Sequence, residues 1–217
     1  MNEDSPKLRQ RLIAAATEVF AEKGFSRAST REICRLAGAN SAAIHYHFGD
    51  KASLYKAVCR PPNSITDVPD ALLSPQSSLR EGLEAFFAPL ARLLTESCLS
   101  PHRHMLLVRE QVLPSGLLND NCVDFFRPRH EQFCRFLCRH CGAAEPDEAI
   151  HHLAVTLGGM AMVLFIKRDF VEAFAPTLLR EGAPLEQTLR RLTDYGVTLV
   201  EAEARRRQAE SGDGPCD

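Results

Sequence analysis

Two short helical segments that flank a glycine-containing turn constrain this fold more than any other part of the sequence. The run Ser29-Thr30-Arg31-Glu32 has the spacing of a capping box and predicts a short helix that ends at Leu36. A turn over 37–40 follows, and Asn40 is a favourable N-cap for a helix over 41–47. Two short helices joined by such a turn and braced by a third helix have the helix-turn-helix geometry.

The bracing helices are predicted on either side of this pair. Residues 6–23 carry apolar side chains at helical spacing, and Gly24 stops this helix as a left-handed C-cap would. A fourth helix is predicted over 51–59, after the turn at 49–50. Ile44 and Phe48 are four residues apart, so they anchor one face of the third helix to the core. The first sixty residues therefore predict a three-helix head followed by a fourth helix.

The rest of the chain also has helical periodicity and no alternating β-branched run, so the predicted fold class is all-α. Further helices are expected over 78–98, 102–113, 120–141, 146–167 and 184–208. Pro89 lies inside the first of these, where it removes a backbone hydrogen bond and bends the helix. We divide the chain into a head (1–59), an irregular Pro-rich linker (60–76), a helical body (77–210) and a tail expected to be disordered (211–217).

Charge is distributed unevenly between the head and the rest of the chain. Residues 1–60 contain ten Lys and Arg against six Asp and Glu, a net of +4, whereas the remainder contains 16 against 22, a net of −6. A basic head on an acidic body suits a head that meets phosphate. We see no export signal and no stretch long enough to cross a bilayer, so we expect a cytoplasmic protein with no membrane partner and with its eight cysteines reduced.

The head carries a set of residues at fixed spacing, namely Thr30-x-x-Ile33, Ala37-Gly38, Ile44-x-Tyr46-His47-Phe48, Lys51 and Leu54-Tyr55. This set resembles the DNA-binding signature of TetR-type regulators over about residues 8–59, and residues 40–49 resemble the CecR-type branch of that family. The resemblance implies a sequence-specific DNA-binding transcriptional regulator, a homodimer on a palindromic operator. It also implies a repressor whose operator affinity an unknown small molecule lowers, with no enzymatic activity, cofactor or metal.

By the same resemblance, one surface of the head meets DNA. The residues expected to contact phosphate are Thr30, Tyr46, His47 and Lys51, and those expected on the base-reading surface are Asn40, Ser41, Ala42, Ala43 and His45. The alternative for Tyr46 and His47 is packing inside the small head, and for Lys51 it is a solvated surface charge. The chain departs from the wider family on this surface, at Ala39, Asn40, Ala42 and His45, so the resemblance does not carry over an operator sequence.

Dimerisation and ligand binding are expected in the body. The resemblance implies pairing through the last two main helices, and the candidate interface residues are Val155, Gly158, Gly159, Met162, Leu192, Gly196 and Leu199. The alternative for the segment 152–165 is internal core. A small-molecule site needs a few polar groups in an apolar cavity. The candidate ligand-binding residues are His104, Arg109, Glu110, Phe126, His130, Phe133 and Met162.

Three cysteines leave an alternative open. Cys134, Cys138 and Cys141 lie at i, i+4 and i+7, so they share a helical face and could form a metal- or thiol-responsive site. The competing interpretation is that they pack as small hydrophobic residues, since no C-x-x-C pair is present. No nucleophile elbow, phosphate loop or carboxylate pair supports an enzyme. A further possibility is that the head binds DNA only to organise it.

Overall fold

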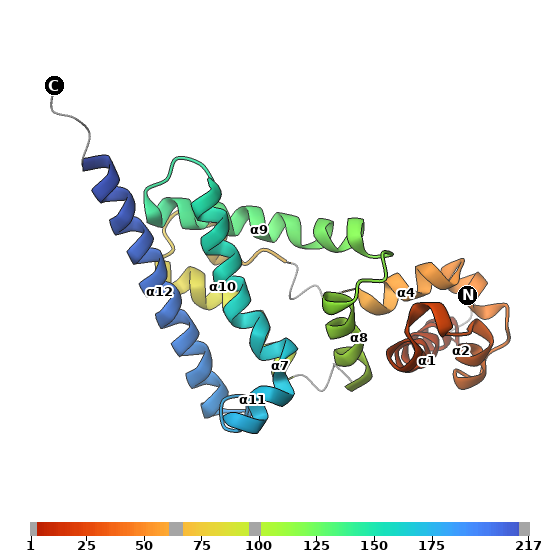
Figure 1. Ribbon diagram of the computed structural model, residues 1–217. Helices are drawn as coiled ribbons and strands as arrows, with labels where there is room; N and C mark the ends of the chain where they lie inside the picture. Colours follow the sequence, from red (N-terminus) through yellow and green to blue (C-terminus); the bar gives the residue numbers. More distant parts are fainter. Residues whose placement is uncertain (1–3, 61–66, 96–100, 213–217) are drawn as a thin grey trace. The chain divides into compact units, whose positions relative to one another are not determined.

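The computed structural model describes residues 4–60, 67–95 and 101–212, and it confirms the predicted all-α class. The described residues form helices joined by turns and loops, and none of them lies in a strand (Figure 1). The chain divides into two compact units: a first unit of residues 1–61 and 97–124, and a second unit of residues 62–96 and 125–217. Each unit has its own core, and each is described separately below.

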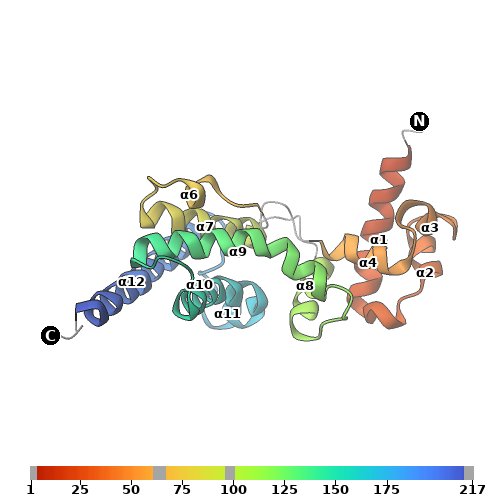
Figure 2. The ribbon, with the colours of Figure 1, turned by 90° about the horizontal axis from the view of Figure 1, so that it is seen from above.

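The first unit contains α1 (Asp4–Arg27), α2 (Thr30–Leu36), α3 (Ala43–Phe48), α4 (Lys51–Cys59) and α8 (Pro101–Val112). Figure 2 shows α2, α3 and α4 gathered beside α1. Helix α8 packs against α1 and α4, and Leu106 of α8 is fully buried in the same core as Leu12 and Phe20. This unit therefore extends beyond the predicted head, because a helix from later in the chain completes its core.

The turn between α2 and α3 is a Schellman motif. Gly38 adopts φ 62°, the left-handed conformation that residues with a side chain rarely adopt. The Ala39 amide donates to the Cys34 carbonyl at 2.8 Å, and the Gly38 amide donates to the Arg35 carbonyl at 3.2 Å. These bonds satisfy carbonyls at the end of α2 and fix the path that the chain takes into α3.

Two of the predicted caps in the first unit are wrong. The Ser29 side chain makes no capping hydrogen bond, and Glu32 pairs instead with the Lys23 ammonium at 2.6 Å. Helix α3 begins two residues later than expected, at Ala43. The reason is that the Asn40 side chain accepts from the Ala42 amide at 3.1 Å and so closes a turn before the helix.

Other local predictions in the first unit are confirmed. Gly24 adopts φ 70° and interrupts α1 at the predicted position, although a further helical turn continues to Arg27. Helix α4 has the predicted bounds, and its N-cap Asp50 accepts from the Ser53 amide at 2.7 Å. Ile44 is 3% exposed, as expected of a residue that anchors α3 to the core.

The second unit contains α6 (Asp70–Leu73), α7 (Leu79–Thr95), α10 (Glu148–Ile166), α11 (Arg168–Phe174), α12 (Ala183–Gly212) and residues 125–141 of α9 (Asn119–Cys141). Helix α12 runs along α7, and α10 packs against both (Figure 1). Between α7 and α9, the rings of Phe86 and Phe133 stack with centroids 3.7 Å apart. Phe136 of α9 is fully buried against the backbone of Gly82 on α7.

Three features of the second unit differ from the expectation. Helix α6 lies inside the predicted irregular linker, where Leu72 is 1% exposed, and α11 was not predicted. Residues 211–212 of the predicted tail belong to α12. Residues 61–66 of the linker and 213–217 of the tail lie outside the described residues. The capping box at the start of α7 is confirmed, since Ser78 and Glu81 each donate a backbone amide to the other's side chain.

Helix α10 corrects the expectation that no segment is long enough to cross a bilayer. Its 19 residues are long and apolar enough to do so by length and composition alone. Core helices of soluble proteins meet the same criterion, so a single helix of this kind is weak evidence for a membrane span. Ile150, Leu157 and Phe165 of α10 are buried in the second unit, whereas other apolar side chains of α10 are exposed.

Candidate nucleic-acid interface and ligand cavity

Helix α3 has one face in the core and the other open to solvent. Tyr46 is 81% exposed, and His45, Asn40, Ser41 and Ala42 are also exposed. The side chain of Ala43 is only 6% exposed because it packs into the core at the first turn of α3. The structure therefore corrects the prediction that Ala43 faces bases, and it leaves the other four predicted base-reading residues on an open surface.

The His45 ring is held at the end of α3 by a hydrogen bond within the helix terminus. Its Nδ1 lies 2.6 Å from the carbonyl oxygen of Gly49. Because a carbonyl oxygen only accepts, Nδ1 donates in this contact, and Nε2 of the neutral ring is then an acceptor. The exposed imidazole is thus fixed in orientation and offers one acceptor to a partner.

Tyr46 and His47 differ in exposure. Their rings meet edge to face, with centroids 4.9 Å apart. His47 is half-buried, and its ring lies 6.3 Å from that of Phe48, so it also packs against the head. The exposed Tyr46 ring does not pack in the core.

The predicted phosphate contact Lys51 is braced by the head itself. Its ammonium donates to the Ala28 carbonyl at 3.0 Å and lies 4.4 Å above the centre of the Phe25 ring. These contacts pin the start of α4 to the end of α1, and they leave further N–H donors on the ammonium. Lys51 is therefore a positioning residue of the head, and its contact with phosphate stays a prediction.

The residues predicted to contact DNA did not include the positively charged side chains of α2. Arg31 and Arg35 are exposed, whereas Ile33 and Cys34 between them are buried. The burial of those two residues directs both guanidinium groups away from the core. Thr30, predicted as a phosphate contact, is half-buried at the first residue of α2.

The predicted ligand-binding residues are divided between the two units. His104, Arg109 and Glu110 lie on α8 in the first unit. Glu110 accepts a hydrogen bond from the hydroxyl of Tyr55 on α4, and its other carboxylate oxygen accepts from the Ser115 amide at 3.2 Å. These contacts hold α8 in the core of the first unit, and a ligand-binding role for its three residues stays a prediction.

The other four predicted ligand-binding residues line one cavity in the second unit. The cavity has a volume of about 260 Å³. Its lining residues are Phe86, Pro89, Phe126, Arg129, His130, Phe133, Ala154, Val155, Gly158, Ala161 and Met162. Most of these side chains are apolar or aromatic, and the cavity therefore has the character of a site for a small apolar molecule.

Arg129 brings a buried positive charge to this cavity, and sequence reasoning missed it. The residue is 7% exposed, and its guanidinium donates to the backbone carbonyls of Asp67 at 2.8 Å and Phe86 at 2.7 Å. Burial lowers the pKa of this guanidinium from its ordinary value. Arg127, two residues earlier, is exposed, and no local sequence signal distinguishes the two.

The predicted dimer residues divide between surface and core. Val155 is 65% exposed, Met162 is 36% exposed and Gly159 is exposed. Gly158 is half-buried and lines the cavity, and Leu199 is half-buried.

The prediction that α12 contributes to the dimer interface is wrong at two of its three residues. Leu192 is 7% exposed, and a Cβ on Gly196 would lie 3.2 Å from Leu83 of α7. These two residues pack inside the second unit, because the apolar stripe of α12 faces α7.

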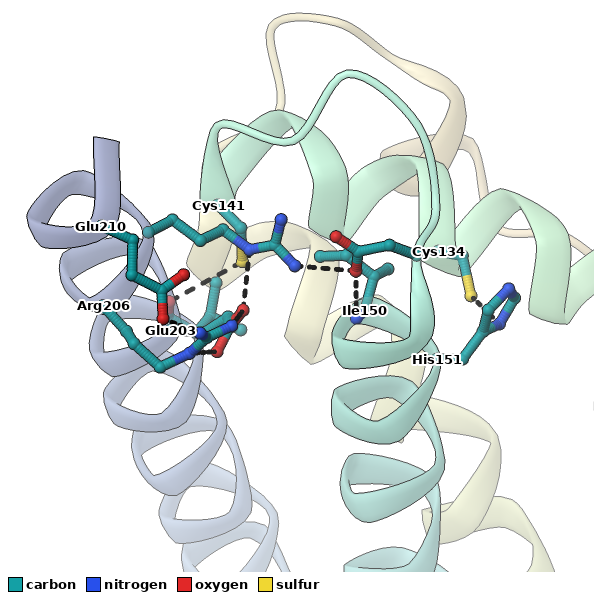
Figure 3. Close-up of polar contacts among 10 residues, drawn as sticks. Cys134, Cys141, Ile150, His151, Glu203, Arg206 and Glu210 are labelled. Atoms are coloured by element: carbon teal, nitrogen blue, oxygen red, sulfur yellow. Dashed lines mark hydrogen bonds and ion pairs between the residues drawn. The ribbon is translucent and has the colours of Figure 1, made fainter. Parts of the chain in front are cut away.

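The three predicted cysteines are buried and do not form one donor set. Cys141 donates to the Val200 carbonyl on α12 at 3.8 Å, whereas Cys134 faces His151 on α10 (Figure 3). Burial raises the pKa of both thiols to about 11. Cys138 is also buried, with its pKa raised by burial. The packing interpretation therefore holds for Cys138 and Cys141.

Comparison with known proteins adds a family to this geometry. Residues 12–58 match the family of bacterial regulatory proteins described as the tetR family. Residues 79–198 match the C-terminal domain of the HTH-type transcriptional dual regulator CecR. The HTH-type transcriptional dual regulator CecR of Shigella flexneri is 30% identical over 165 residues, which cover 69% of this chain and 72% of that protein.

Solved structures share the fold at low sequence identity. The structure of HlyIIR, a hemolysin II transcriptional regulator, has a TM-score of 0.59 at 18% identity, covering 88% of this chain and 97% of that one. Native NalD, the secondary repressor of the MexAB-OprM multidrug efflux pump in Pseudomonas aeruginosa, has a TM-score of 0.57 at 21% identity, covering 90% and 97%.

Proposed function

Because the chain belongs to the tetR family of bacterial regulatory proteins and is a transcriptional regulator with a CecR-type C-terminal domain, we propose that it is a ligand-responsive repressor. In this proposal a homodimer binds a palindromic operator through α3, and a small molecule in the second unit lowers that affinity. The open face of α3, on which Tyr46 is 81% exposed, is the observation that carries the DNA-binding part.

The exposed groups of α3 suit contact with a DNA groove. The acceptor Nε2 of His45 matches the amino donors that adenine and cytosine present in the major groove. Tyr46 is proposed to reach phosphate through its hydroxyl, and the exposed Arg31 and Arg35 add positive charge on the neighbouring helix α2. Small residues at Ser41 and Ala42 allow the start of the helix to approach the DNA closely.

The exposed apolar face of α10 supports a homodimer. Val155, Met162 and Val163 are 65%, 36% and 49% exposed, and Gly159 between them allows close approach of a second helix. Tyr195 on α12 is 53% exposed, and it lines a pocket together with Leu164 of α10. A two-fold dimer would cover this face with the same face of a second copy and present two α3 helices to half-sites about 34–36 Å apart.

The cavity in the second unit suits a small apolar effector with an acidic group. Its volume of about 260 Å³ lies between the roughly 150 Å³ that holds benzene and the roughly 300 Å³ at the lower end of drug-sized pockets. Arg129 is the buried cation in its wall. An effector carboxylate would pair with this guanidinium, while Phe86 and Phe133 contact the apolar part.

Selection from a random DNA pool, followed by a compound screen on the selected operator, tests the proposal. We expect one palindromic sequence to be enriched, Tyr46→Ala to weaken binding to it, and an apolar acid to release the protein. Arg129→Met should abolish that release while operator binding without the compound persists. Equal binding to random DNA would refute sequence-specific regulation, and a compound that binds tightly without changing operator affinity would refute the proposed response.

A further inference from the structure

Two histidines and one cysteine from α9 and α10 bring their donor atoms together. His130 Nε2 lies 3.2 Å from His151 Nδ1, and Cys134 Sγ lies 3.5 Å from each of these nitrogens. Among the residues that the structure describes, this is the one group of three His, Cys, Asp or Glu donor atoms within 4.8 Å of one another. We propose that His130, Cys134 and His151 bind a divalent transition-metal ion, of which Zn²⁺ fits best.

The three distances match one face of a zinc tetrahedron. Zinc binds imidazole nitrogen at about 2.05 Å and thiolate sulfur at about 2.3 Å, so tetrahedral angles place two nitrogens about 3.3 Å apart and nitrogen and sulfur about 3.6 Å apart. The observed separations are 3.2 Å and 3.5 Å, each within about 0.1 Å of the separation between donors that share one zinc ion. Nitrogen and thiolate donors together favour zinc over magnesium or calcium.

Local structure places the backbone of each ligand residue before any ion binds. His130 and Cys134 are four residues apart on α9, so they lie on one face of that helix. His151 lies in the first turn of α10, where its amide donates to the carbonyl of the N-cap residue Asp147 at 3.0 Å. The Asp147 carboxylate accepts from Arg207 of α12 at 2.7 Å, which ties the start of α10 to α12.

Access to the site comes from the α10 side. Cys134 is buried, His130 is half-buried and His151 is exposed, so we expect an ion to enter from solvent past His151. On binding, the Cys134 thiol releases one proton to water and its sulfur forms the metal bond, while both imidazoles bind through neutral nitrogens. The site then has a charge of +1, and its fourth position takes water or another ligand.

This donor set differs from the row of three cysteines on α9. Within the part of the chain that the structure describes, Cys138 and Cys141 belong to no such group, and the Cys141 thiol donates to the Val200 carbonyl. His152, the neighbour of His151, is exposed on the same turn of α10 but outside the group. The chain therefore offers a matched control for each kind of ligand.

Metal binding by the full-length, tag-free protein tests the proposal without any DNA or effector. We expect one equivalent of Zn²⁺ by dialysis and elemental analysis, and with Co²⁺ the intense visible bands of a tetrahedral site plus a thiolate-to-cobalt charge-transfer band. His151→Ala should weaken binding at least about tenfold, whereas His152→Ala should bind as the wild type does. Cys134→Ser should lose the charge-transfer band, and Cys138→Ser should keep it.

Each alternative outcome overturns the proposal. Less than half an equivalent of Zn²⁺ at saturation would mean that the three groups are only hydrogen-bonded to one another. Equal effects of the His151 and His152 substitutions, or cobalt binding with no thiolate band, would mean adventitious binding elsewhere. Far-UV circular dichroism of each variant separates the loss of a metal ligand from misfolding. The His151 variant is the most informative, because His151 is exposed and its substitution leaves the core intact.

Discussion

Replacing Tyr55 with phenylalanine removes one hydroxyl from the centre of the first unit and leaves the packing of the ring intact. Tyr55 is 1% exposed, and its ring meets Phe20 and Phe25 edge to face at centroid distances of 4.8 and 5.2 Å. The hydroxyl donates to a carboxylate oxygen of Glu110 on α8. Tyr55→Phe therefore separates the contribution of this hydrogen bond from that of ring burial.

The expected cost follows from the surroundings of the hydrogen bond. A hydrogen bond to a charged group contributes about 1.5–3 kcal/mol to stability. Glu110 is half-buried and keeps its contact with the Ser115 amide in the variant, so solvent compensates part of the loss. We therefore expect the free energy of unfolding at neutral pH to fall by about 1.5–2 kcal/mol, the lower part of that range.

The pH dependence of this difference is the sharper test. Burial, and then the hydrogen bond to Glu110, raise the pKa of Tyr55 above its ordinary value of 10.0. The folded phenol stays protonated where the unfolded phenol ionises, so the stability that Tyr55 contributes is complete below pH 10 and is lost as the pH rises further. Between pH 10 and 11 the wild type should lose about 1 kcal/mol more than the phenylalanine variant, as the slope approaches its limit of about 1.4 kcal/mol per pH unit.

Urea unfolding followed by circular dichroism, from neutral pH to about pH 11, measures both effects. Tyr46→Phe is the control, because that hydroxyl is on an 81% exposed ring and its loss should leave stability unchanged. A difference below about 0.5 kcal/mol at neutral pH would mean that water replaces the hydrogen bond at no cost. A difference that stays constant above pH 10 would refute the raised pKa.

Three further predictions concern DNA binding, packing and acid stability. Tyr46→Ala should weaken operator binding by about 1–3 kcal/mol in a gel-shift titration while the urea midpoint stays unchanged. Gly82→Ala places a methyl group 2.1 Å from the buried ring of Phe136, and urea unfolding should show a loss of about 1–3 kcal/mol despite the better helix propensity of alanine. The hydrogen bond from Arg207 lowers the pKa of Asp147 from its ordinary value of 3.8, so wild-type stability should fall as the pH drops below that value, and Arg207→Ala should flatten this fall in acid unfolding curves.

Sequence reasoning succeeded where the decisive contact is local. The bounds of α4 follow from Asp50, whose side chain bonds three residues along the chain. The Ser29–Glu32 pair has the same three-residue spacing but does not form the predicted cap, since Glu32 instead accepts a hydrogen bond from Lys23, nine residues earlier. Local spacing shows that a cap can form, but a competing partner that comes from another helix decides whether it does.

The ligand cavity and the dimer interface were also predictable only in part. Phe126, His130 and Phe133 were predicted because a ligand site combines a few polar groups with apolar neighbours, and these three residues do line a single cavity. Arg129 was missed because its partners are backbone carbonyls 62 and 43 residues away. Gly196 was misassigned, since an apolar stripe does not reveal whether its own protomer or a second copy covers it.

His130 belongs both to the wall of the cavity and to the group of three metal-binding candidates. An ion on its Nε2 and an effector against its ring would therefore share one side chain. Thermodynamic linkage then requires reciprocity: if the ion changes the affinity for the effector by some factor, the effector changes the affinity for the ion by the same factor. Dissociation constants for an effector, measured with and without bound ion, would thus report the coupling from either side.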